Sequence, residues 1–201
     1  YADGSTKSLR SYLHQLFEYA VDENIIASNP HDRVVVRKHK EAKKVDAYNA
    51  EDNDKIVKYL KANPTSENIM FYVLISTGMR VGEASALQWS DINLKERTIN
   101  INKTIVWMKG SFTIQPHTKT NAGMRTIYIS KNVCDILSKF SPQEKSGYVF
   151  LNYRGNPWTH KTLRKYWVEN CAKIGIEYKN IHSLRHTFAT YALEYGMDVK
   201  T

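Results

Sequence analysis

The sequence has few cysteines and no pattern that would make them metal ligands. Cys134 and Cys171 are the only two among 201 residues, and both fall on the apolar side of predicted helices. No CxxC pair is present, and the histidines lack the spacing of zinc ligands, so we expect no metal and no other cofactor. Two isolated thiols of this kind are typical of core residues in a reducing compartment.

Long apolar segments are absent as well. No run reaches the roughly 20 residues that a membrane-spanning helix requires, and no secretory signal pattern is present. These absences predict a cytoplasmic protein without a membrane partner. Because the sequence begins at Tyr1 and not at a methionine, we also expect it to be a piece of a longer protein.

What the sequence has in excess is positive charge. Lysine and arginine number 29 against 20 aspartate and glutamate residues, which gives a net charge of +9. A chain this basic usually binds a polyanion, most often nucleic acid. The alternative is a basic surface that serves solubility alone.

Hydrophobic periodicity predicts a mainly α-helical protein with a small three-stranded antiparallel β-sheet. The predicted helices span residues 5–24, 49–61, 67–77, 81–87, 131–139, 160–174 and 183–195, and the predicted strands span 98–107, 111–116 and 124–129. The helix over 67–77 is apolar on nearly all sides, which is typical of a central, buried helix. Gly78 and Gly175 are placed to end helices in the left-handed conformation, and Ser183 is placed to cap one.

A basic segment follows the first predicted helix. We interpret residues 31–48 as a linker between two domains, and its basic residues as a strap along a DNA backbone. Those residues are Arg33, Arg37, Lys38, Lys40, Lys43 and Lys44. The alternative is a charged loop that only water surrounds.

Two short segments place cations at helix starts, where backbone N–H groups also favour anions. Arg80 follows the predicted stop at Gly78, and Glu83 lies one turn further on, where its carboxylate can orient the guanidinium. Taken alone, this pair is an ordinary i, i+3 ion pair. His182 and Arg185 share one face at the start of the last predicted helix, and this spacing alone is a weak signal.

Taken together and in order, these segments resemble the motifs of the tyrosine recombinase (phage integrase) family. The segment TGMRVGEASALQWSDI at 77–92 resembles its first arginine box, and HSLRHTFAT at 182–190 resembles its second. Between them, Thr118-Lys119-Thr120, followed by RTIYI at 125–129, resembles its β-hairpin lysine. Residues 1–30 are similar to the end of the core-binding domain, which makes 49–201 a catalytic domain of the family's fold.

The resemblance implies site-specific recombination of double-stranded DNA through a 3′-phosphotyrosyl intermediate, as in integrases of phages and conjugative transposons. It implies that Arg80 and Arg185 clamp the phosphate, that His182 assists proton transfer, and that Lys119 is the general acid. Glu83 and His186 then have supporting roles. It also implies a homotetramer on synapsed DNA.

The family's nucleophilic tyrosine has no match in the sequence, so we expect it after Thr201 and expect these 201 residues alone not to cleave DNA. Tyr191 and Tyr195 follow Arg185 on the same predicted helix, where their spacing predicts that both point into the core. Two alternatives stay open: a non-cleaving DNA-binding relative with an architectural or regulatory role, and, more distantly, a type IB topoisomerase.

Overall fold

The computed structural model describes residues 3–34, 46–108, 111–116, 124–141 and 147–196. The chain divides into two compact units, Tyr1–Lys44 and Val45–Thr201, and each is described by itself. Among the described helices, none is both long and apolar enough to cross a membrane.

The first unit consists of helix α1 (Asp3–Asp22) and the 3₁₀ helix η1 (Pro30–Arg33). Asn29 joins them, because its side-chain amide donates to Glu18 Oε1 over 2.6 Å while its oxygen caps η1. His14 lies between two carboxylates, with Nδ1 3.9 Å from Glu18 and Nε2 3.5 Å from Asp32. Part of the apolar side of α1 remains exposed, at Leu9, Tyr12 and Leu16, whereas Leu13 and Phe17 are partly buried.

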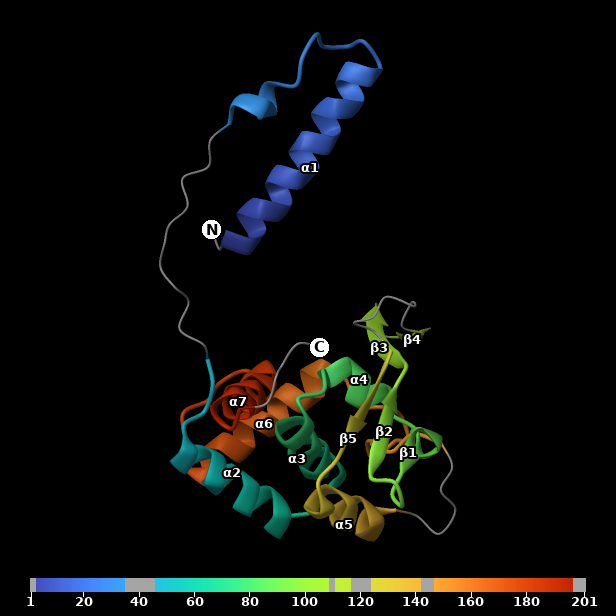
Figure 1. Cartoon of the computed structure of the whole chain (residues 1–201), viewed down its shortest axis with the longest axis vertical. Coiled ribbons are helices and arrows are strands. Elements are labelled where there is room, and N and C mark those ends of the chain that lie inside the picture. The colour runs from blue at the N-terminus through green and yellow to red at the C-terminus, as the bar shows by residue number, and fades with distance from the viewer. Residues whose placement is uncertain (1–2, 35–45, 109–110, 117–123, 142–146, 197–201) are drawn as a thin grey trace. The chain divides into compact units, whose positions relative to one another are not determined.

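The second unit is built around one buried helix, as the apolar segment at 67–77 predicts. Helix α3 (Ser66–Thr77) is buried from Asn68 to Ile75. Helices α2 (Ala50–Ala62), α5 (Lys131–Phe140) and α7 (His182–Glu194) pack against it (Figure 1). Helix α6 (His160–Ile174) adds Trp167, whose ring lies 5.0 Å from that of Phe71 at the core centre.

The sheet has three antiparallel strands, but the strands differ from the prediction. Its order is β1 (Ile92–Asn93), β2 (Thr98–Ile101) and β5 (Arg125–Tyr128). Strands β3 (Lys103–Met108) and β4 (Ser111–Pro116) form a separate two-stranded ribbon that pairs Trp107 with Phe112. The predicted single strand over 98–107 is therefore wrong.

The strand breaks at Asn102 because side chains at that point turn to a buried carboxylate. Asn102 Nδ2 and Lys103 Nζ donate to Asp91 Oδ1 over 3.2 and 2.9 Å. Asp91 ends the 3₁₀ helix η2 (Trp89–Asp91), which follows helix α4 (Val81–Ala86). This local network could not be predicted from the alternation of apolar residues.

The last helix also differs from the prediction in two details. It begins at His182, and Ser183 is not its cap, because the Ser183 hydroxyl donates to Asp46 Oδ2 over 2.8 Å. Tyr191 is partly buried, but Tyr195 is 81% exposed. The prediction that Tyr195 points into the core is wrong, because the residue lies at the end of the helix, past its packed turns.

Candidate phosphate-binding site

The site begins at the junction of α3 and α4, where Gly78 ends α3 with φ +66°. A Cβ on Gly78 would lie 2.4 Å from Cδ1 of Phe188 in α7. The position therefore requires glycine twice, for its left-handed backbone and for the close approach of the ring. The absence of a side chain at Gly78 thus lets the Phe188 ring of α7 lie close to the end of α3.

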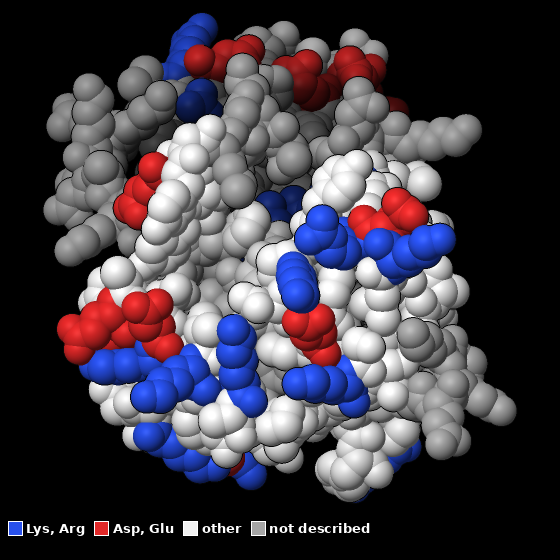
Figure 2. All heavy atoms as spheres, turned by 60° about the horizontal axis from the view of Figure 1, so that its bottom comes forward, with Lys and Arg blue, Asp and Glu red and all other residues white. Residues whose placement is uncertain are grey.

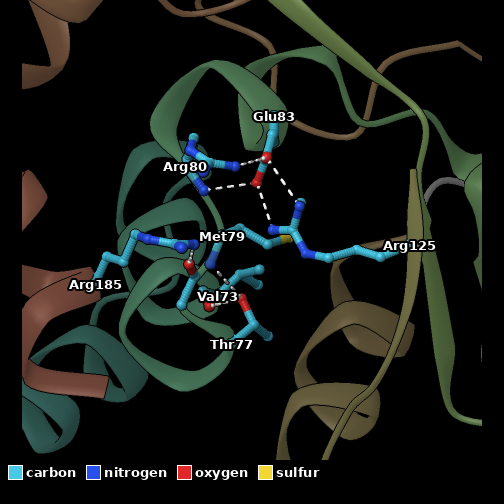
Figure 3. A network of polar contacts seen from close by, with 8 residues as sticks. Val73, Thr77, Met79, Arg80, Glu83, Arg125 and Arg185 are labelled. Atoms are coloured by element: carbon cyan, nitrogen blue, oxygen red, sulfur yellow. Dashed lines mark hydrogen bonds and ion pairs between the residues drawn. The ribbon is translucent and has the colours of Figure 1, made fainter. Parts of the chain in front are cut away.

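Arg80 stands at the start of α4 and is fixed from within by Glu83. The Arg80 backbone N–H donates to Glu83 Oε2, and its Nη1 donates to Oε1, each over 2.8 Å. The Glu83 side chain has no exposed surface, whereas 51% of the Arg80 side chain is exposed. The buried carboxylate thus orients a half-exposed guanidinium, and Figure 3 shows the contacts between them.

A second arginine, which the sequence analysis did not single out, holds the same carboxylate. Arg125 opens β5, and its Nη1 and Nη2 donate to Oε1 and Oε2 of Glu83 over 3.1 and 2.8 Å. Its side chain is only 16% exposed. In the sequence, Arg125 stands out only as a cation at the start of an apolar strand. Nothing in the spacing connects it to Glu83, which lies 42 positions earlier.

These contacts keep Glu83 ionised although it is buried. Burial raises the pKa of its carboxyl, but the hydrogen bonds from Arg125 and Arg80 outweigh burial, and the net shift is downward. Glu83 therefore carries a full negative charge at neutral pH.

Arg185 reaches the same junction from α7. Its Nη1 donates to the carbonyl oxygen of Gly78, two residues before Arg80 (Figure 3). Burial lowers the pKa of Arg185 and the charge of Arg80 lowers it further, while Glu83 raises it. An arginine nevertheless remains protonated at neutral pH. Three guanidinium groups, those of Arg80, Arg125 and Arg185, thus gather around one carboxylate, and these four described side chains together carry an excess of two positive charges.

His182 lies beside Arg80 and Arg185, at the first turn of α7. Burial lowers its pKa, and the neighbouring His186, Arg185 and Arg80 lower it further. The imidazole is therefore mainly neutral at pH 7, so it can donate one hydrogen bond and accept another. The His186 ring packs edge-on against it, 4.7 Å between centroids.

The structure thus brings together five of the residues predicted from the motifs: Arg80, Glu83, His182, Arg185 and His186. Lys119 lies outside the described residues, as do Arg37, Lys38, Lys40, Lys43 and Lys44 of the basic segment. Arg33 is described and ends η1 in the first unit.

The face carrying α2 and α5 has a different character. Figure 2 shows lysine and arginine side chains there interspersed with acidic ones. Mixed charges of this kind offer no continuous positive surface to a polyanion. The excess positive charge around Arg80 and Arg185 is therefore a property of the site and not of every face.

Comparison of the chain with known proteins identifies its family. The model of the phage integrase family matches residues 45–201. A tyrosine recombinase XerC-like protein of Caldanaerobacter subterraneus subsp. tengcongensis is 28% identical over 223 residues, which cover 97% of this chain and 56% of that protein. The chain thus spans about half the length of this relative.

Two solved structures share the fold. The Tn1549 transposon integrase in complex with a circular intermediate DNA matches with TM-score 0.80 and 18% identity, covering 98% of this chain and 69% of the other. The lambda integrase tetramer bound to a Holliday junction matches with TM-score 0.65 and 20% identity, covering 97% and 56%. With its family model matched over most of its length and both motifs at one site, the chain belongs to the phage integrase family.

Proposed function

We propose that this chain is the larger part of a site-specific DNA recombinase that integrates or excises a mobile element. The observation that carries the proposal is the position of Arg80 and Arg185 at one junction with an excess of two positive charges and His182 beside them. A phosphodiester supplies the anion that such a site requires, and arginine forks match its non-bridging oxygens.

In the proposed reaction, a tyrosine hydroxyl attacks the DNA phosphorus and displaces the 5′ oxygen of the next nucleotide. The tyrosine gives up its proton, the 5′ oxygen gains one, and a 3′-phosphotyrosyl bond replaces the phosphodiester. Arg80 and Arg185 stabilise the charge on the pentavalent phosphate, and neutral His182 assists through a hydrogen bond. Lys119 is the proposed general acid for the 5′ oxygen.

The nucleophile is proposed to lie in sequence after Thr201. Tyr195 is exposed but stands ten residues beyond Arg185, about 15 Å along a helix at the usual rise. Tyr191 is nearer, but burial and the charge of Glu194 raise the pKa of its hydroxyl. Neither tyrosine suits an attack on a phosphate held at the first turn of α7.

The DNA partner is proposed to contact both units. The first unit is proposed to be the end of a core-binding domain (1–30), and residues 31–48 a basic linker to the catalytic domain (49–201). A tetramer on paired DNA sites follows from the analogy with lambda integrase, which forms a tetramer on a Holliday junction.

The test is a nicked suicide substrate, which traps a phosphotyrosyl link because the short 5′ fragment diffuses away. The 201-residue chain and a longer protein that continues past Thr201 with its native sequence are incubated with it and separated by denaturing electrophoresis. We expect a covalent band only from the longer protein. A band from the 201-residue chain would mean that the nucleophile is misplaced, and none from the longer protein would favour the non-cleaving alternative.

A further inference from the structure

From Arg80 and Arg125, the Glu83 carboxylate receives four hydrogen bonds, two on each oxygen. Oε1 accepts from Arg80 Nη1 and Arg125 Nη1, and Oε2 accepts from the Arg80 backbone N–H and Arg125 Nη2. Arg80 therefore depends on a carboxylate that Arg125, from a different element, also holds through two bonds (Figure 3). Because that carboxylate is buried, losing one partner would leave its charge without sufficient compensation.

We infer that Arg125 is a positioning residue for the proposed reaction: it fixes both oxygens of Glu83, and thereby sets the direction in which Arg80 presents its guanidinium to DNA. This inference rests on the proposed function. Arg125 itself is largely buried, and both of its terminal nitrogens donate to Glu83. It therefore acts through Arg80 and not on the phosphate.

The sheet explains why Arg125 can do this. Its backbone pairs with Ile101 of β2, a residue that is 3% exposed and belongs to the core. The position of Arg125 is thus determined by the sheet, independently of the loop that carries Arg80. A fork anchored in a sheet holds a carboxylate with little freedom, because two parallel N–H···O bonds restrict both distance and orientation.

The chain contains a matched control at Lys103. Lys103 Nζ lies 2.6 Å from Asp91 Oδ2, and the two side chains are 16% and 7% exposed, against 16% and 0% for Arg125 and Glu83. Asp91 also accepts the backbone N–H of Gln88, as Glu83 accepts that of Arg80. The Lys103 pair therefore has similar burial and the same local role, but among the described residues it contacts none of the site.

The experiment compares Arg125→Gln with Lys103→Gln. In the 201-residue chain, NMR follows the titration of the Glu83 carboxyl and the rotation of the Arg80 guanidinium. The charged groups that face Glu83 from the described elements are Arg80, Arg125 and Arg185; Lys103 of the adjacent β3 is paired with Asp91. We expect R125Q to raise the pKa of Glu83 and to free the rotation of Arg80, and K103Q to do neither.

In the longer protein, the same variants are compared by the rate of adduct formation at saturating DNA across pH. Since R125Q raises the pKa of Glu83, protonation at the acid end should release Arg80, and the rate relative to the parent should fall by about tenfold for each pH unit below that raised pKa. The deficit should shrink as pH rises and Glu83 ionises. DNA affinity should change less than about twofold, because phosphate contacts elsewhere dominate it.

A conservative variant distinguishes loss of the hydrogen bonds to Glu83 from misfolding. Arg125→Lys keeps the charge but loses the fork, so its pH profile should lie between those of the parent and R125Q. The inference is overturned if R125Q leaves the Glu83 titration and the Arg80 rotation as they are, or if its rate loss is the same at every pH and equals that of K103Q. If the unsubstituted longer protein forms no adduct, the proposed function fails, while the NMR titration still decides whether Arg125 positions Arg80.

Discussion

At the scale of single residues, the site depends on a glycine as much as on its charged groups. Gly78 ends α3, offers its carbonyl oxygen to Arg185, and leaves room for the Phe188 ring. Gly78 thus allows the segment with Arg80 and the helix with Arg185 to lie close together. Its place before Arg80 could be read from the sequence as a helix stop, but its contact with Phe188 could not, because 110 positions separate them.

Gly78→Ala should therefore destabilise the chain more than an ordinary glycine substitution. A left-handed alanine costs about 1–2 kcal/mol, and crowding the ring adds about 1–3 kcal/mol. Urea unfolding should give a loss of about 3 kcal/mol. Gly175→Ala is the control, since Gly175 has φ +77° but nothing within 4 Å of an added Cβ, and it should cost about 1 kcal/mol. Equal losses would contradict the close contact with Phe188.

At the scale of elements, the segment before α2 secures the helix that carries His182 and Arg185. The Tyr48 N–H donates to the Thr187 hydroxyl over 2.9 Å, and Asp46 accepts from Ser183, both on α7. Thr187 is fully buried. The segment that precedes α2 is thus hydrogen-bonded to the helix that carries His182 and Arg185.

Thr187→Val should loosen this attachment without changing the size of the side chain. The buried Tyr48 N–H would lose its acceptor, at a cost of about 1–3 kcal/mol. Amide hydrogen exchange at Tyr48 should become faster by a corresponding factor of roughly 5 to 150. Thr190→Val on the same helix is the control and should leave that exchange unchanged; if Thr187→Val also leaves it unchanged, the attachment does not exist in solution.

The sequence predicted elements better than it predicted their partners. Periodicity located the helices to within a few residues, and Gly78 and Gly175 do end helices in the left-handed conformation. The strand over 98–107 was wrong because the polar side chain of Asn102 turns to Asp91. Arg125 was missed as a partner of Glu83 for a related reason: both outcomes depend on contacts between distant segments, which local patterns do not encode.

At the scale of the whole molecule, the net charge of +9 predicts that DNA binding depends steeply on salt. Each neutralised phosphate contributes about −0.9 to the slope of log K against log salt concentration. Changing Lys38, Lys40, Lys43 and Lys44 together to glutamine should flatten that slope and weaken binding to all sequences about equally, because phosphate contacts carry no sequence information.

The matched control changes four lysines of α2 and α5 to glutamine: Lys58, Lys61, Lys131 and Lys139. It removes the same charge from elements whose face mixes both signs (Figure 2), so it should flatten the slope much less. Fluorescence anisotropy between 50 and 200 mM salt, about the range where counterion release is well measured, distinguishes the two. A slope near zero for the parent chain, or equal changes in both variants, would contradict a DNA-binding linker.

The central claim is that Arg80 and Arg185 act together on one phosphate in the transition state. The most direct measurement compares DNA cleavage with DNA binding in the longer protein for Arg80→Ala, Arg185→Ala and, as a control, Arg164→Ala. Arg164 lies on α6, and its Nε donates to the Tyr178 hydroxyl. We predict that each site variant loses roughly 10²-fold or more in cleavage while its DNA affinity changes about threefold or less. Arg164→Ala should change cleavage no more than affinity. Equal losses of cleavage and affinity in Arg80→Ala and Arg185→Ala would contradict the account.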